Sequence, residues 1–96
     1  MPAYMLVQAK ITDPVRFRSY AEIASRLVKK FGGRYIVLGG ESLQLEGVTT
    51  SQKCVISEWP DIETALQFWN SPEYAEAKLL REGTGEFDVR LIKGWE

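Results

Sequence analysis

The sequence predicts an α+β domain in which a four-stranded antiparallel sheet carries its helices on one face. Three observations support this prediction. Strand-like segments flank each of two capped helical segments, apolar residues alternate in the former and recur at helical spacing in the latter, and the chain of 96 residues has room for one core. Residues 1–96 are therefore expected to form a single domain.

The first half opens with a strand and a long helix. Residues 3–11 alternate between two sets of side chains, one of them fully apolar, which is typical of a strand with one buried face. Asp13 suits an N-cap and Pro14 suits the first helical position, and from there apolar residues recur at helical spacing as far as Phe31. Gly32 then supplies a left-handed cap that ends the helix.

The rest of the chain is predicted to hold three strands and an interrupted helix. One helical piece begins after the cap Asp61, and Ser71 with Pro72 repeats the cap and first-turn chemistry for a second piece that runs to about Glu82. Residues 42–47 can form either a further strand or an arm. The predicted strands are residues 35–38, 53–59 and 87–92.

This order of strand, helix, strand, strand, helix, strand is the ferredoxin-like pattern, in which the helices cover one face of the sheet. The residues expected to face the helices are Met5, Val7, Ala9, Phe87, Val89 and Leu91. The opposite face would carry Tyr4, Leu6, Gln8, Lys10, Asp88, Arg90 and Ile92. Because this second face is neither a dry core nor a plain solvated surface, we expect two sheets to pack face to face in a homodimer, a dimeric α/β barrel.

Composition excludes several classes of function. The 12 basic and 13 acidic residues are interleaved and give a net charge of −1, so no nucleic-acid partner is expected. No apolar stretch approaches the roughly 20 residues that span a bilayer, so no membrane partner is expected either. The lone Cys54 cannot form an intrachain disulfide and the amino terminus does not resemble a signal peptide, which predicts a cytoplasmic protein.

The chain contains no histidine, which restricts its chemistry further. Imidazole is the usual base of Ser and Cys nucleophiles and a frequent ligand of zinc and haem iron. We therefore expect no cofactor and no metal site, and any acid or base must be Asp, Glu, Lys, Tyr or Cys54.

Several short motifs, spread in order over nearly the whole chain, resemble one family. They are Met1-Pro2-Ala3-Tyr4, Thr12-Asp13-Pro14 with Tyr20, Phe31-Gly32-Gly33-Arg34-Tyr35, Gly39-Gly40-Glu41, Glu46-Gly47, Glu58-Trp59-Pro60 and Asn70-Ser71-Pro72-Glu73-Tyr74. The family that they resemble is domain of unknown function 1330. The resemblance implies a dimeric alpha-plus-beta barrel, a superfamily that also holds cofactor-free monooxygenases, small isomerases, haem-degrading enzymes and stress-responsive proteins. It does not imply a particular reaction, and the haem-degrading branch usually relies on a histidine that this chain lacks.

Two charged residues lie at informative positions. Glu58 is near the end of an otherwise apolar strand, where its carboxylate is a candidate catalytic base; the alternative is an ion pair with Arg90 or another cation of the sheet. Arg81 has Ala77 and Lys78 at the preceding helical-neighbour positions, so no acid there can pair with it. We expect Arg81 to be a solvated surface residue.

The candidate ligand-binding residues are Tyr20, Arg34, Trp69, Asn70 and Tyr74. Each also has a structural reading: the tyrosines and Trp69 suit core packing, Arg34 a surface ion pair, and Asn70 hydrogen bonds at a helix end. The leading hypothesis is a homodimer that binds a small aromatic or carboxylated molecule between sheet and helices, with or without cofactor-independent catalysis. The alternative is a non-catalytic dimeric structural or interaction protein, marked by buried ion pairs among Lys10, Asp88 and Arg90 and by no cavity.

Overall fold

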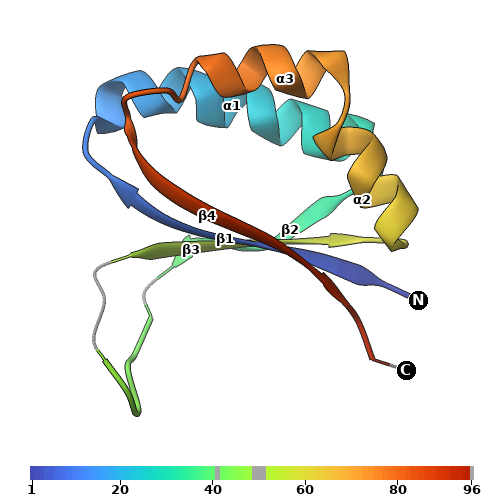
Figure 1. Cartoon of the computed structure of the whole chain (residues 1–96), viewed down its shortest axis with the longest axis horizontal. Helices are drawn as coiled ribbons and strands as arrows, with labels where there is room; N and C mark the ends of the chain where they lie inside the picture. Colours follow the sequence, from blue (N-terminus) through green and yellow to red (C-terminus); the bar gives the residue numbers. More distant parts are fainter. Residues whose placement is uncertain (41, 49–51, 96) are drawn as a thin grey trace.

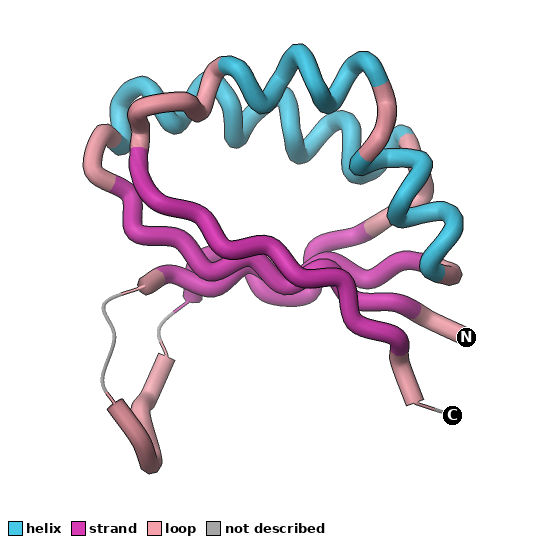
Figure 2. Tube along the Cα trace, viewed as in Figure 1, coloured by secondary structure: helices cyan, strands magenta, loops and turns pink. Residues whose placement is uncertain are grey.

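The computed structural model describes residues 1–40, 42–48 and 52–95, which form an antiparallel sheet with three helices on one face (Figure 1). The layers are plain in Figure 2, where all the helices lie on the same side of the strands. In chain order the elements are β1 (Ala3–Ile11), α1 (Pro14–Lys30), β2 (Arg34–Gly40), β3 (Lys53–Trp59), α2 (Ile62–Trp69), α3 (Pro72–Leu79) and β4 (Gly85–Lys93).

The four-stranded sheet has the order β2-β3-β1-β4, with β1 and β3 in the centre. All three strand pairs are antiparallel, and β1 pairs with β3 from Ala3 opposite Trp59 to Ala9 opposite Lys53. This topology confirms the predicted ferredoxin-like α+β fold. Since side chains alternate across a strand, each strand contributes one set to the helix-covered face and one to the open face.

The strands were predicted more closely than the irregular segments. β1 and β3 have the predicted bounds, whereas β2 and β4 are each longer than expected. Residues 42–48 are not a strand; they project from the sheet on the side away from the helices (Figure 2). The prediction that the last helix reaches Glu82 was wrong, because from Leu80 onwards the backbone N–H groups bond to carbonyls three residues back and Gly83 takes a φ of 76°.

Local chemistry fixes the ends of α1 as the sequence indicates. The Asp13 carboxylate accepts a hydrogen bond of 3.1 Å from the backbone N–H of Arg16, and Pro14 occupies the first turn. Lys29 and Lys30 lie in the last turn, where the helix dipole favours cations. Gly32 follows with a φ of 96°, the left-handed geometry that glycine adopts without steric cost.

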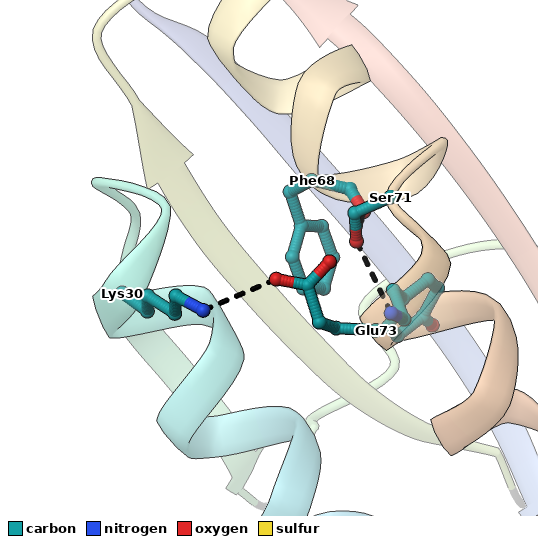
Figure 3. A network of polar contacts seen from close by, with 5 residues as sticks. Lys30, Phe68, Ser71 and Glu73 are labelled. Atoms are coloured by element: carbon teal, nitrogen blue, oxygen red, sulfur yellow. Dashed lines mark hydrogen bonds and ion pairs between the residues drawn. The ribbon is translucent and has the colours of Figure 1, made fainter.

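The junction between α2 and α3 is held by Ser71 (Figure 3). Its hydroxyl accepts a bond of 3.1 Å from the N–H of Tyr74 and donates one of 2.8 Å to the carbonyl of Phe68, so it links the end of one helix to the start of the next. Lys30 of α1 forms an ion pair of 3.1 Å with Glu73 in the first turn of α3. The cap therefore sets the position of Tyr74, one residue beyond that ion pair.

Replacing Ser71 with Ala is expected to lower the free energy of unfolding by about 1 kcal/mol, because both hydrogen bonds of the cap are lost at a buried site. Urea unfolding would measure the change. Ser25→Ala is the matched control, since Ser25 is exposed within α1 and alanine is the better helix former there. Equal unfolding midpoints for the two variants would contradict the capping role.

The core lies between the helices and the covered face of the sheet. Trp59 is its largest fully buried side chain, at 1% exposure, and its ring lies 5.0 Å from that of Phe68 between centroids. A Cβ atom on Gly33 would lie 2.8 Å from the Trp59 ring, so only glycine fits at that position. The buried residues of this cluster are Ala3, Met5, Tyr20, Ala24, Val28, Trp59, Ala65, Phe68, Tyr74 and Ala77.

The second face of the sheet is not covered by any element of the described chain. Across its centre, Leu6 of β1 pairs with Ile56 of β3, which in turn pairs with Val37 of β2. These three apolar residues form a row that we call the open-face row; each is only partly buried. No helix in the described ranges is long and apolar enough to cross a membrane.

Candidate functional site

A cavity of about 440 Å³ lies between the covered face of the sheet and the helices. Its walls are mainly apolar and aromatic, and they come from every element of the fold. The lining residues are Met5, Val7, Ala9, Ile11, Phe17, Arg18, Tyr20, Ala21, Glu22, Ala24, Ser25, Val28, Tyr35, Leu38, Gly39, Lys53, Val55, Ser57, Phe68, Tyr74, Arg81 and Phe87. The alternation predicted for β1 and β4 therefore placed Met5, Val7, Ala9 and Phe87 correctly.

The mouth of the cavity can be located from the exposure of its lining. The exposed members are Arg18, Glu22 and Ser25 on α1, together with Leu38 and Lys53 on the facing strands. Since these exposed residues come from α1, β2 and β3, the cavity opens between α1 and the β2 edge of the sheet rather than the β4 edge. Leu38, which is 67% exposed, lies at this opening.

Two tyrosines meet inside the cavity although they are 54 residues apart in sequence. The hydroxyl of Tyr20, from α1, lies 2.8 Å from the hydroxyl of Tyr74, from α3, and the two share one hydrogen bond. Both residues were candidate ligand-binding residues, and the structure brings them together. Two hydroxyls carry two protons, so one proton joins the pair and the other is free to be donated to a third group.

Burial raises the pKa of two phenols of the cavity, Tyr35 and Tyr74. Desolvation, followed by the nearby Tyr20, raises the pKa of Tyr35 from 10.0 to about 12. Desolvation also raises the pKa of Tyr74 well above its ordinary value, with a further upward contribution from the charge and hydrogen bond of Tyr20. Near neutral pH these two side chains are hydroxyl donors rather than phenolate bases.

Arg81 lies at the end of the cavity formed by Tyr20 and Phe87. Its position there corrects an expectation from the sequence. It was predicted to be solvated, but it is only partly exposed, lines the cavity and holds its guanidinium carbon 4.5 Å from the ring centroid of Phe87. The same carbon lies 5.3 Å from the ring centroid of Tyr20. The prediction failed because helical spacing was applied to a residue that follows the end of α3 at Leu79.

Glu58 and Arg34 lie together on the open face of the sheet, away from the cavity lining. The Arg34 Nη2 atom is 2.7 Å from Glu58 Oε1, and the hydroxyl of Tyr4 donates a bond of 3.3 Å to Oε2. The side chain of Arg34 is 72% exposed and that of Glu58 is 28% exposed. Glu58 thus makes an ion pair with a cation of the sheet, as the structural alternative anticipated, although the cation is Arg34 and not Arg90.

Trp69 and Asn70 do not line the cavity. The Trp69 ring packs against Tyr74 with centroids 5.3 Å apart and carries the ammonium of Lys78 4.4 Å from its centroid. Asn70 is exposed and ends α2, where its backbone N–H bonds to the carbonyl of Leu66 at 2.9 Å. Their candidate ligand-binding roles stay predictions.

The raised pKa values predict a loss of stability at alkaline pH. A phenol whose pKa is raised by folding contributes stability that is complete below its unfolded pKa and is lost as pH rises through its folded pKa. For Tyr35 this window runs from 10.0 to about 12. The free energy of unfolding of the wild type, measured with urea, is expected to fall steeply across that window. It should fall less steeply in Tyr35→Phe and Tyr74→Phe. Equal slopes against pH in all three proteins would contradict the assignment.

Within residues 1–40, 42–48 and 52–95, no group of three His, Cys, Asp or Glu side chains is placed to hold a metal ion. The polar side chains of the cavity wall are hydroxyls, the three cations Arg18, Lys53 and Arg81, and a single carboxylate, that of Glu22 at the mouth.

Solved structures share this fold at low sequence identity. A protein of unknown function from Rhodopseudomonas palustris matches with a TM-score of 0.80 at 18% identity, over 99% of this chain and 83% of that one. SnoaB, a cofactor-independent oxygenase from Streptomyces nogalater, matches with a TM-score of 0.72 at 12% identity, over 99% and 94%. A dimeric protein of unknown function with a ferredoxin-like fold, from Bacteroides fragilis, matches with a TM-score of 0.65 at 15% identity, over 97% and 96%. At these identities the matches show the fold alone.

Fold and cavity together define a ferredoxin-like α+β protein with an aromatic-lined site between sheet and helices. Residues 2–95 match the family described as a domain of unknown function (DUF1330), and the chain belongs to that family. This confirms the family that the sequence motifs indicated. No curated protein matches the chain in sequence.

Proposed function

We propose that this protein binds a small organic molecule, aromatic or carboxylated, in the cavity between the sheet and the helices. The observation that carries the proposal is the cavity itself, whose 440 Å³ falls within the range of about 300 to 1,000 Å³ typical of ligand sites. Its walls are apolar apart from a few polar groups, which is the usual composition of a site that orients a small ligand.

The aromatic walls support a ring-shaped ligand. Phe17 stacks on Phe87 with centroids 5.7 Å apart and an interplanar angle of 15°, and Phe68 lies 4.4 Å from Tyr74. Rings held by such contacts present fixed faces, against which a planar ligand can stack or lie edge-on. The hydroxyl pair of Tyr20 and Tyr74 would then fix the orientation of its polar group.

In a catalytic form of this proposal the protein acts without a cofactor, as the fold neighbour SnoaB does. Glu58 stays a proposed general base, positioned by Arg34, but only for chemistry at the open face, because its carboxylate lies outside the cavity lining. Glu58→Gln tests this role once a ligand is identified. Loss of turnover with unchanged affinity supports it, and unchanged turnover removes it.

We further propose that the protein is a cytoplasmic homodimer formed through the open face of the sheet. The open-face row of Leu6, Ile56 and Val37 supplies apolar contact area, and Ile92 on the same face is 45% exposed. The neighbour from Bacteroides fragilis, described as dimeric, supports self-association of a chain with this fold. The alternative function, a dimeric structural protein without a ligand, is less well supported, since a cavity is present.

Native mass spectrometry with mixtures of small organic acids and aromatic compounds tests ligand binding directly. We expect adducts of one molecule per chain, and the same compounds should raise the melting temperature in a thermal-shift screen, because a ligand that binds only the folded state stabilises it. Val7→Trp, which would fill the cavity from β1, should abolish both signals if the ligand sits there. Absence of any bound compound at millimolar concentration would overturn the proposal.

A further inference from the structure

We propose that the cavity selects organic anions, and specifically that Arg81 binds the carboxylate of a planar aromatic acid. This inference rests on the proposed function, because it concerns the ligand of the same cavity. It adds the charge of the ligand and the residue that recognises it.

The charges on the cavity wall favour an anion. The lining contains three cations and one carboxylate: Arg18, Lys53, Arg81 and Glu22. Glu22 is exposed and lies at the mouth, whereas Arg81 is partly buried at the aromatic end formed by Phe87 and Tyr20. An anionic ligand would therefore meet a surplus of positive charge both on entry and at its binding position.

Arg81 has no counter-ion within the described chain. Three ion pairs occur among the described residues, and Arg81 takes part in none of them. A partly buried cation without a carboxylate partner carries a desolvation cost that an incoming carboxylate can offset. The guanidinium is also suited to that group, because its planar fork donates two parallel hydrogen bonds to the two oxygens.

The surroundings of Arg81 fix its position from two sides. Its guanidinium carbon lies 4.5 Å from the Phe87 centroid and 5.3 Å from the Tyr20 centroid, contacts that stabilise a cation over aromatic rings. Its backbone is held by Thr84, a residue with 0% exposure whose N–H bonds to the Arg81 carbonyl at 3.0 Å. A side chain held in this way loses little conformational entropy when it binds a ligand.

The hydroxyl groups inside the cavity, away from Glu22 at the mouth, can also donate. One proton of the Tyr20–Tyr74 pair is free, as described above, and both phenols are surrounded by apolar walls. The Ser57 hydroxyl accepts a bond of 2.9 Å from Trp59 Nε1, which leaves its own proton available. A carboxylate, which only accepts hydrogen bonds, matches this set of donors better than an amide or an amine, which also donates.

Isothermal titration calorimetry with two probes of equal shape tests the inference. Naphthoate carries the carboxylate, and naphthamide is its neutral counterpart. We expect the wild type to bind naphthoate about tenfold more tightly than naphthamide, as befits a charge-assisted pair. Arg81→Gln should abolish this preference by weakening naphthoate alone, and Arg81→Lys should restore part of it, since lysine keeps the charge but not the fork.

Arg26→Gln is the matched control, because Arg26 is an exposed arginine of α1 that does not line the cavity. It should keep the wild-type preference. Equal affinity of the wild type for both probes, or a preference that survives Arg81→Gln, would overturn the inference and leave the proposed ligand-binding function standing. Failure of both probes to bind the wild type would overturn the inference, while the broader screen with other compounds decides the proposed function separately. If Arg81→Gln does not fold, Arg81→Lys and the two-probe comparison in the wild type decide the question.

Discussion

Replacing Trp59 with Ala is expected to lower the free energy of unfolding by about 3–5 kcal/mol. Trp59 is 1% exposed, packs against Phe68 and fills the space left by Gly33, so its removal leaves a cavity that the rigid sheet cannot close. A domain of this size has a total stability of about 5–15 kcal/mol, so the variant should be close to unfolding at room temperature. Urea unfolding followed by far-ultraviolet circular dichroism would measure the loss without depending on tryptophan fluorescence.

Trp95→Ala provides the matched control, because Trp95 is 96% exposed and the same atoms are removed. Its unfolding free energy should stay within about 0.5 kcal/mol of the wild type. Measurement at several protein concentrations separates any contribution of Trp95 to a dimer from its contribution to the folded chain. Similar losses in the two variants would show that Trp59 does not anchor the core.

Ile56→Asp is expected to convert the proposed homodimer into monomers. Ile56 lies in the middle of the open-face row, between Leu6 and Val37, and a carboxylate there would have to be buried against the partner sheet without a counter-ion. Light scattering coupled to size exclusion should then report 10.9 kDa for the variant and about twice that mass for the wild type. Because the side chain faces away from the cavity, the monomer should remain folded.

The control for this experiment is Val15→Asp. Val15 is 79% exposed in the first turn of α1, where an acid is compatible with the helix dipole, and it lies on the helical layer rather than on the open face. It should keep the mass of the wild type. A wild-type protein that is monomeric at micromolar concentration, or an Ile56→Asp variant that remains dimeric, would contradict assembly through this face.

The elements that the sequence predicts well are those with local signals. Alternation in residues 3–11 and the caps Asp13, Asp61 and Ser71 are short-range features, and the structure contains the strand and all three caps. The end of α3 was missed because the residues beyond Leu79 have ordinary helix propensity, and their tight turn depends on Thr84, whose carbonyl accepts bonds from the chain that enters α1.

The candidate site was harder to predict, because it depends on contacts between distant segments. Nothing local indicates that Tyr20 and Tyr74 share a hydrogen bond, or that Arg81 reaches the ring of Phe87. In β3, apolar residues occur on both faces of the strand, so alternation alone did not decide which face carries Glu58. Its neighbour Trp59 was the useful signal, since a tryptophan buried toward the helices requires the preceding residue to point the other way.

The cavity and the open face lie on opposite sides of the same sheet, only one layer of strands apart. Along β1, Met5, Val7 and Ala9 border the cavity, while Leu6 between them belongs to the open face. Under the proposed function, neighbouring codons of this short segment are subject to different selection pressures, those of a ligand on one side and those of a partner surface on the other. Relatives that have changed ligand but kept their assembly should differ in this strand at every second residue.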